Sequence, residues 1–152
     1  MALAGRSRSW QLAAHLTAEL AHGGPVSATA RYHSVIEACS QAREWLQALV
    51  ALEAMWCQCL VSELITFNMA MKACAQSKQW RRNLLLLSNG QSHLVLPNVV
   101  TYSTAIHACD KGGKWEHGLQ LLTDMRKVVV DPGVISYNAA LSACARARQW
   151  EP

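Results

Sequence analysis

The chain has 152 residues, of which 51% are hydrophobic and 16% are charged. This length and this apolar fraction are typical of one globular domain and disfavour a disordered chain. Polar residues interrupt the most apolar segment, so no run of about 18 apolar residues indicates a membrane-spanning helix. The net charge of +4 permits an anionic partner without identifying one.

The aromatic residues and cysteines reveal an internal repeat. Five of the six tryptophans follow one another at steps of 35 residues: Trp10, Trp45, Trp80, Trp115 and Trp150. The same step relates two further series: Tyr32, Phe67, Tyr102 and Tyr137, and then Cys39, Cys74, Cys109 and Cys144. A fixed period of this length is the signature of a repeat protein.

Each 35-residue unit is predicted to contain two helices. In the unit that begins at residue 99, Tyr102, Ile106 and Cys109 are spaced by four and three residues, which places them on one face of a helix. A second stripe with helical spacing begins at Trp115. The segment 110–114 between them contains two glycines, which suit a helix end and a tight reversal. Each unit is therefore predicted to be a helical hairpin.

Stacking of these hairpins predicts the fold class. A single hairpin of this length cannot bury its apolar face, so the units are expected to form an all-α fold, a right-handed α-solenoid of stacked 35-residue helical hairpins. The expected units are 29–63, 64–98, 99–133 and a truncated unit at 134–152. In the unit 64–98, the polar segment 88–92 replaces Met and Leu of the other copies, and we expect its second helix to end early there.

Residues 1–28 have two competing interpretations. Trp10, Leu16 and Leu20 are in register with the second helix of a unit, which favours a partial or degenerate repeat. The segment is also rich in Arg, Ser and Ala and poor in acids, as organellar transit peptides are. Because neither end of the chain supplies the polar cap that a solenoid needs, the chain is expected to be a fragment of a longer array.

The units resemble the pentatricopeptide repeat family. The resemblance covers roughly residues 29–150 and is clearest in VVTYSTAIHACDKGGKWEHGLQLLTDMRKVVVDPG and VISYNAALSACARARQW. The neighbouring tetratricopeptide class has a shorter period and a different Trp, Gly and Tyr pattern. The resemblance implies sequence-selective binding of single-stranded RNA, with about one base read per unit, in mitochondria or chloroplasts. It also implies a role in organellar RNA processing, stability or translation.

The resemblance implies which residues read the bases. In this family they are the residue after the opening aromatic and the last residue of the same unit. Carried onto this sequence, the base-reading residues are His33 with Glu63, Asn68 with Asn98, Ser103 with Gly133, and Asn138 without a partner. The pair Asn68 and Asn98 is a usual combination and implies a pyrimidine. Glu63 would bring a negative charge and Gly133 brings no side chain, so these units depart from the family pattern.

Two further sets of contacts follow. The resemblance implies that aliphatic residues near the start of each unit clamp the bases, here Ile65, Val100 and Ile135, with Ala30 in the first unit. Without the resemblance, these would be interpreted as partly buried residues at a helix start. Basic residues recur near the turn between the two helices, and they include Lys78, Lys111, Lys114 and Arg146. They suit either a solvated rim or phosphate contacts, and the resemblance favours phosphate.

The cysteines and histidines are not predicted to form a metal site, a disulfide or a catalytic centre. Equivalent positions on successive packed helices lie about 8 to 10 Å apart, which is too far for a disulfide or for convergence on one zinc ion. The four periodic cysteines are predicted to be small packing residues with reduced thiols, as in an intracellular compartment. No nucleophile, base and orienting group converge, so we expect no enzyme and no cofactor.

Two functions from different classes stay open at this stage. The first is a module that binds single-stranded RNA, alongside other RNA-processing proteins and without a membrane partner. The second is a protein-interaction solenoid of the tetratricopeptide kind, in which the same surface holds a peptide. The period, the basic balance and the polar residues Asn68, Ser103 and Asn138 favour RNA.

Overall fold

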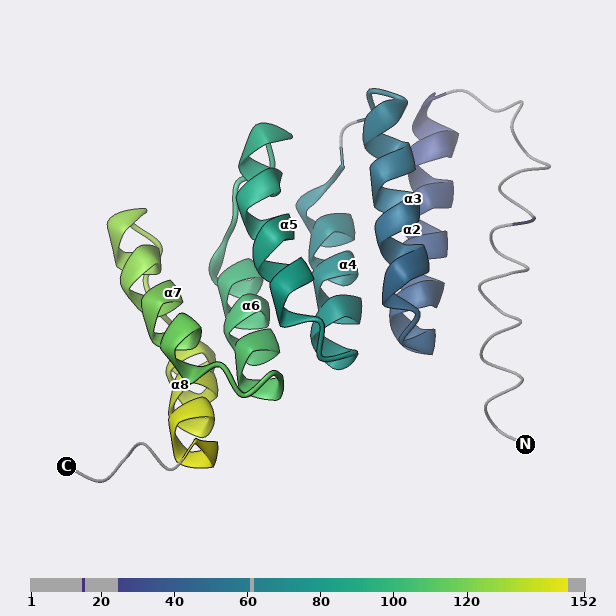
Figure 1. Cartoon of the computed structure of the whole chain (residues 1–152). Coiled ribbons are helices and arrows are strands. Elements are labelled where there is room, and N and C mark those ends of the chain that lie inside the picture. Colours follow the sequence, from purple (N-terminus) through teal and green to yellow (C-terminus); the bar gives the residue numbers. More distant parts are fainter. Residues whose placement is uncertain (1–14, 16–24, 61, 148–152) are drawn as a thin grey trace, which may run out of the picture. The chain divides into compact units, whose positions relative to one another are not determined.

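The computed structural model describes residues 15, 25–60 and 62–147, and these residues form helices joined by short turns (Figure 1). The helices are α2 (Pro25–Ala42), α3 (Trp45–Cys57), α4 (Leu64–Gln76), α5 (Trp80–Ser92), α6 (Val99–Lys111), α7 (Trp115–Lys127) and α8 (Val134–Arg146). No strand occurs among the described residues. None of the helices described is long and apolar enough to cross a membrane.

The helix boundaries repeat with the period of the sequence. The second helices α3, α5 and α7 begin at Trp45, Trp80 and Trp115, and each has 13 residues. The first helices α4, α6 and α8 begin 35 residues apart and also have 13 residues each. The predicted pairing of two helices per unit is confirmed over this range. Residues 1–14 and 16–24, with Trp10, lie outside the described residues.

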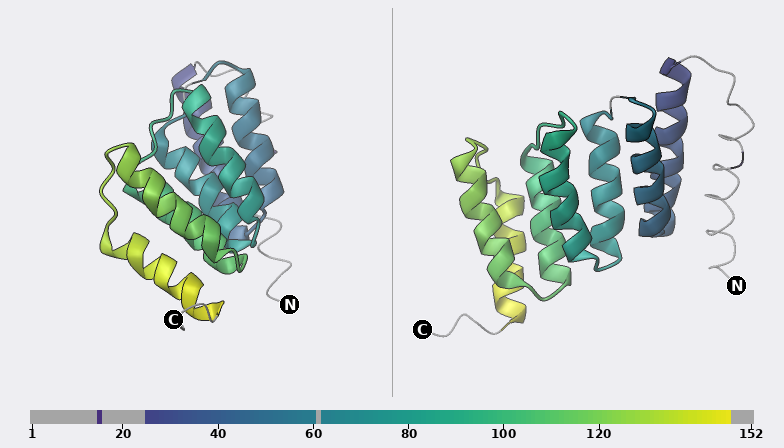
Figure 2. Two further views of the ribbon diagram at one scale, coloured as in Figure 1. Left: turned by 60° about the vertical axis from the view of Figure 1, so that its left-hand side comes forward. Right: turned by 45° about the horizontal axis from the view of Figure 1, so that its top comes forward.

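The chain divides into two compact parts, residues 1–73 and 74–152, and the division falls within α4. In the N-terminal part, α2 and α3 lie side by side as a hairpin (Figures 1 and 2). In the C-terminal part, α6 packs against α5, α7 and α8.

Each part has its own apolar core. In the N-terminal part, Ile36, Leu52 and Phe67 are fully buried, and the ring centroids of Trp56 and Phe67 lie 6.4 Å apart. In the C-terminal part, the fully buried side chains include Cys74, Ile106 and Met125. The periodic cysteines Cys39, Cys74 and Cys109 belong to these cores and carry free thiols.

The turns repeat as well as the helices. Arg43, Lys78 and Gly113 follow the first helices with φ between 59° and 67°, and Cys59, Leu94 and Val129 follow the second helices with φ between 54° and 60°. The backbone N–H one residue further on donates to the last turn of the helix, as from Glu44 to the Cys39 oxygen at 2.9 Å and from Val130 to the Met125 oxygen at 2.9 Å. These bonds satisfy carbonyl groups that the helix ends would otherwise leave unpaired.

One expectation about a helix boundary is wrong. The helix α5 does not end at the polar segment 88–92 but continues to Ser92, because the Ser88 hydroxyl donates to the Leu85 carbonyl and the Gly90 carbonyl accepts the closing bond from the Val95 N–H. The backbone of this segment is thus paired despite its polar side chains. The helix α2 begins at Pro25, four residues before the expected start of the unit 29–63, since proline is tolerated in the first helical turn.

Candidate nucleic-acid interface

Most of the predicted base-reading residues lie near the N-terminal end of a first helix, whereas His33 lies in the middle of α2. His33, Asn68, Ser103 and Asn138 lie within α2, α4, α6 and α8, and Glu63, Asn98 and Gly133 directly precede the last three of these helices. This end of a helix exposes backbone N–H groups that have no partner within the helix. The side chains predicted to read bases therefore compete with, or contribute to, the capping of these helices.

Asn98 is the N-cap of α6, and this role limits what it offers to a ligand. Its Oδ1 accepts from the backbone N–H of Thr101 at 3.0 Å and from the Thr101 hydroxyl at 3.0 Å. The Thr101 hydroxyl in turn accepts from the Asn98 backbone N–H at 3.2 Å, which completes a capping box. The side-chain amide N–H groups of this exposed residue are therefore what it can offer to a ligand.

The other two residues at this place in a unit differ from Asn98. Gly133 is the N-cap of α8 with extended backbone and makes no side-chain cap. Glu63 is exposed, and its backbone carbonyl accepts from the Phe67 N–H at 3.1 Å. Where the unit 64–98 offers an amide, the unit 29–63 thus offers a carboxylate and the unit 99–133 offers no side chain.

The residues after the opening aromatics contact the next unit. The His33 Nδ1 lies 3.0 Å from the Thr66 hydroxyl, and the Ser103 hydroxyl lies 2.7 Å from the Ser136 hydroxyl. Ser103 is 8% exposed, so only a small part of its side chain is open to a ligand. The sequence analysis missed Thr66 and Ser136, although Thr66, Thr101 and Ser136 share one place in the 35-residue register.

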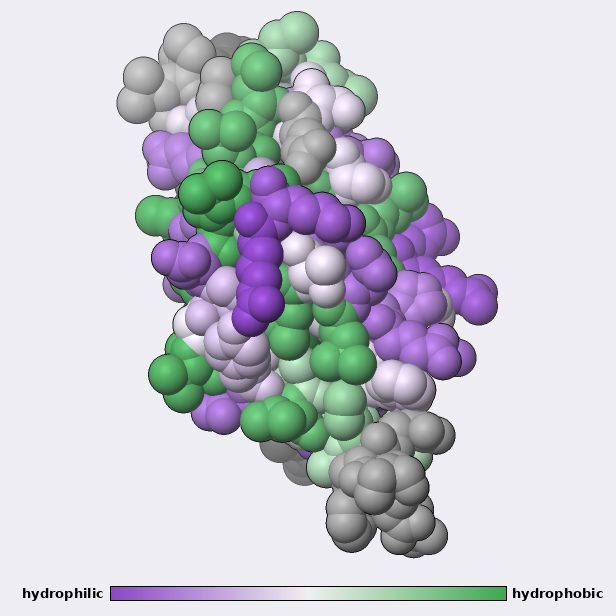
Figure 3. Space-filling model, turned by 90° about the vertical axis from the view of Figure 1, so that its left-hand side faces the viewer, coloured by the Kyte–Doolittle hydropathy of each residue, from purple (hydrophilic) through white to green (hydrophobic). Residues whose placement is uncertain are grey.

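The predicted base-clamping residues are exposed. Ile65, Val100 and Ile135 are 59%, 56% and 73% exposed, and Ala30 is exposed as well. They do not pack into the cores as ordinary residues at a helix start would. Figure 3 shows hydrophobic side chains at the surface of the face that carries α7 and α8. The role of Ile65, Val100 and Ile135 as base clamps stays a prediction.

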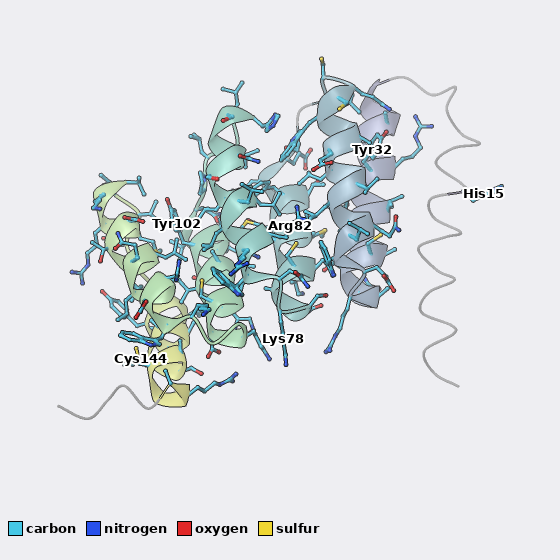
Figure 4. All side chains as sticks on the ribbon, in the orientation of Figure 1. His15, Tyr32, Lys78, Arg82, Tyr102 and Cys144 are labelled. Atoms are coloured by element: carbon cyan, nitrogen blue, oxygen red, sulfur yellow. The ribbon has the colours of Figure 1, made fainter. Side chains whose placement is uncertain are left out.

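The basic residues lie at the opposite end of the first helices. Lys78 follows α4 and extends away from the helices (Figure 4), and Lys111 is the last residue of α6. Ser103 and Lys111 are separated by about 12 Å along the axis of α6, at 1.5 Å per residue. Lys114 lies with its Nζ 5.8 Å from the centre of the Trp80 ring, and the Arg146 Nε lies 3.5 Å from an oxygen of buried Asp110. A phosphate at these cations would therefore lie well to one side of the base-reading residues.

Burial keeps the thiols of three periodic cysteines neutral. Burial raises the pKa of Cys39 and of Cys109 to about 11 and that of Cys74 to about 12. A neutral thiol is a poor nucleophile and a poor metal ligand. Within the described residues, no group of three or more His, Cys, Asp or Glu side chains could hold a metal ion.

Comparisons with known proteins find the repeat family that the sequence resembles. The family model of the PPR repeat family matches residues 97–146. Among solved structures, the chain is similar to the crystal structure of the pentatricopeptide repeat protein PPR10 from maize, with a TM-score of 0.74 and 26% identity. This match covers 94% of the chain and 21% of PPR10, and it confirms the predicted all-α solenoid. No curated protein sequence matches the chain.

Several findings thus agree: the 35-residue step of the helices, the motifs in residues 97–146 and the likeness to PPR10. Residues 97–146 match the pentatricopeptide repeat family, and the chain shares the fold of PPR10.

Proposed function

We propose that this chain binds single-stranded RNA and reads about one base per 35-residue unit, with the units at 29–63, 64–98 and 99–133. The match of residues 97–146 to the PPR repeat family and the likeness to PPR10 support RNA binding of the pentatricopeptide type in general. The chain spans about a fifth of the length of PPR10, so the RNA step that it serves is part of the proposal. We place that step in organellar RNA processing, stability or translation.

One observation carries the proposal. The beginnings of α4 and α8 each combine an exposed aliphatic side chain with a polar residue three positions later, as at Ile65 with Asn68 and at Ile135 with Asn138. An exposed aliphatic group next to hydrogen-bonding groups suits a flat nucleobase, which needs an apolar contact on its face and polar contacts on its edge. The same pairing recurs with the period of the units, which suits a regular polymer such as RNA.

The unit 64–98 is the most informative one. Asn68 and Asn98 both carry amides that can meet the edge of a pyrimidine. We therefore expect a pyrimidine preference at one nucleotide, and Asn68→Ala is expected to flatten it while leaving the neighbouring nucleotides unaffected. The measurement is fluorescence anisotropy of labelled RNA 12-mers that differ at one base at a time.

A matched control separates base reading from general attraction. Lys111→Ala is expected to weaken binding of all the RNAs alike, because a phosphate contact carries no base information. Equal losses for all four bases in Asn68→Ala, or the tightest binding with a purine at that nucleotide, would contradict the assignment of this unit. Binding of a peptide library with no retention of RNA would instead favour a protein-interaction solenoid.

The location is a separate part of the proposal. The family resemblance supports a mitochondrion or a chloroplast, and the free thiols of Cys39, Cys74 and Cys109 are compatible with a reducing compartment. Fractionation of cells that express the chain from its own gene, followed by immunoblotting, tests it. Recovery in the cytosolic fraction alone would contradict an organellar role without bearing on RNA binding.

A further inference from the structure

Two buried hydroxyl groups contact the residues that are predicted to read bases in the preceding unit. Thr66 is 2% exposed and Ser136 is fully buried. Each contacts the residue 33 positions earlier, His33 at 3.0 Å in the N-terminal part and Ser103 at 2.7 Å in the C-terminal part. Both hydroxyls come from the third residue of their own unit, directly before the opening aromatic. The contact therefore recurs in the register of the repeat.

The direction of the hydrogen bonds at Ser103 follows from counting protons. A serine hydroxyl has one proton to donate and two lone pairs that accept. Ser103 donates to the Val99 carbonyl at 2.6 Å, which uses its proton. Ser136 must then donate in the contact of 2.7 Å, which uses one lone pair of the Ser103 oxygen. Ser103 is left with one lone pair and presents a hydrogen-bond acceptor to a ligand.

The same reasoning at His33 gives the opposite polarity. A buried hydroxyl that does not donate its proton costs about 1 to 3 kcal/mol, so the Thr66 hydroxyl donates to the Nδ1 of His33. A neutral imidazole has one protonated and one unprotonated nitrogen. Because Nδ1 accepts, Nε2 carries the proton. His33 therefore presents a hydrogen-bond donor to a ligand.

We propose that Thr66 and Ser136 are positioning groups that set the hydrogen-bond polarity of the base-reading residue in the preceding unit. Thr66 makes His33 a donor, which selects an oxygen or an unprotonated ring nitrogen of a base. Ser136, by donating to Ser103, keeps the Ser103 proton on the Val99 carbonyl and leaves Ser103 an acceptor, which selects an amino or imino N–H. The choice of base atom rests on the proposed RNA binding, whereas the polarity is a property of the protein without RNA.

The first experiment measures this polarity in the free protein. Two-bond ¹H–¹⁵N spectra near pH 8, above the ordinary histidine pKa of about 6.5, distinguish the two ring nitrogens of each histidine. The His33 signals are identified by their loss in His33→Gln. We expect the Nε2–H tautomer in the wild-type chain, a mixture of tautomers in Thr66→Val, and the wild-type pattern in Thr66→Ser, which keeps the hydroxyl. An Nδ1–H tautomer in the wild type, or no change in a folded Thr66→Val, would overturn the proposal.

The second experiment measures the consequence for RNA. We expect Ser136→Ala to reduce, by about fivefold, the preference among RNA 12-mers that differ at the nucleotide read by Ser103, which corresponds to one hydrogen bond. Ser136→Thr, which carries the residue found at positions 66 and 101, should keep the preference. An unchanged preference in Ser136→Ala would overturn the role of Ser136. If the wild-type chain binds no RNA at all, the proposed function fails. The tautomer of His33 in the free protein then still tests whether Thr66 sets the hydrogen-bond polarity of His33.

Discussion

The indole ring of Trp80 lies directly against the backbone of Gly112, so that a Cβ at position 112 would overlap the ring. The ring centroid of His117 is 5.1 Å from that of Trp80, and the Arg81 guanidinium carbon lies 5.2 Å from the ring centre. Trp80 is only half-buried. This tryptophan therefore packs between the turn that follows α6 and the first turn of α7 rather than inside the core.

This contact predicts that Gly112→Ala destabilises the chain. The nearest ring atoms belong to the rigid part of the Trp80 side chain, so the ring or the turn must shift. Overpacking of this kind costs about 1 to 3 kcal/mol. Chemical denaturation followed by circular dichroism measures the loss.

Gly118 provides the matched control. A Cβ at this position in α7 would lie 3.7 Å from Ile106 and 3.9 Å from Cys109, which are ordinary contacts. Since alanine favours a helix over glycine by about 0.5 to 1 kcal/mol, Gly118→Ala is expected to be stabilising. An equal loss of stability in both variants would contradict a specific contact between Trp80 and position 112.

The helices and their period could be predicted from the sequence because apolar residues recur at helical spacing in every unit. The turns could be predicted only in part. Gly113 suggests a left-handed residue in one unit, but Arg43 and Lys78 adopt the same conformation at the equivalent place. Their side chains oppose it, and the repeated hydrogen bonds at the helix ends outweigh that cost. The sequence shows which side chain is present, but it does not show whether the hydrogen bonds at a helix end outweigh the cost of the left-handed conformation.

The candidate site was predictable only as a set of positions in the register. The hydrogen bonds of Asn98 with Thr101, and of Ser103 with Ser136, determine which atoms are left for a ligand. The first depends on the N-cap geometry of α6, and the second depends on how successive first helices pack. A repeat spacing contains neither kind of information. The hydroxyls at positions 66 and 136 therefore could not be identified from the sequence.

The left-handed conformation of Val129 predicts that Val129→Gly is stabilising. This residue has φ of 60° and is 91% exposed, so its side chain loses no packing. A left-handed conformation costs a residue with a Cβ about 1 to 2 kcal/mol. Glycine removes this cost, but it loses more backbone entropy on folding, which cancels part of the gain. We expect a gain of about 1 kcal/mol in the free energy of unfolding. Val128→Gly, at a residue with φ of −93°, should show no such gain.

The buried thiols predict a loss of stability in alkaline solution. Burial raises the pKa of Cys39 and Cys109 from 9.0 to about 11 and that of Cys74 to about 12. Above pH 9 the unfolded chain therefore binds fewer protons than the folded chain, and stability falls until the pH passes the folded pKa. The maximum slope is about 1.4 kcal/mol per pH unit for each thiol.

A single cysteine variant isolates this effect from the titration of lysines and tyrosines. In Cys109→Ala, the decline of the unfolding free energy between pH 9 and 11 should be shallower than in the wild type. In the native state, iodoacetamide should modify the exposed Cys57 and Cys59 and leave Cys39, Cys74 and Cys109 unmodified. Identical pH profiles for the variant and the wild type would contradict the burial of this thiol.

The ion pair of Arg146 predicts that Arg146 and Lys111 contribute unequally to RNA binding. Its Nε lies 3.5 Å from Asp110, whose carboxylate also accepts from the Ser142 hydroxyl at 3.4 Å. Lys111→Gln is expected to reduce the salt dependence of RNA binding by about 0.7 in the slope of log K against log salt, as for one phosphate contact. Arg146→Gln should leave the slope unchanged because its charge is engaged by Asp110. Anisotropy titrations at several salt concentrations measure both, and equal slope changes would show that Arg146 also meets a phosphate.

Asn98 allows capping and base reading to be separated by two substitutions. Asn98→Asp keeps an oxygen that accepts from the Thr101 backbone and hydroxyl, and aspartate caps a helix about as well as asparagine. Asn98→Ala loses the cap at a cost of about 1 kcal/mol. We therefore expect the free energy of unfolding of Asn98→Asp to be about that of the wild type and that of Asn98→Ala to be lower.

The RNA result is expected to follow a different order. The free group of Asn98 is its amide nitrogen, which donates, and an aspartate at this place only accepts and adds a negative charge. Asn98→Asp should therefore change the base preference at the nucleotide read by the unit 64–98 although it folds as well as the wild type. Anisotropy with RNA 12-mers varied at that nucleotide provides the measurement. If Asn98→Asp keeps both the affinity and the base preference of the wild type, Asn98 is a helix cap alone and the base is read by Asn68 without it.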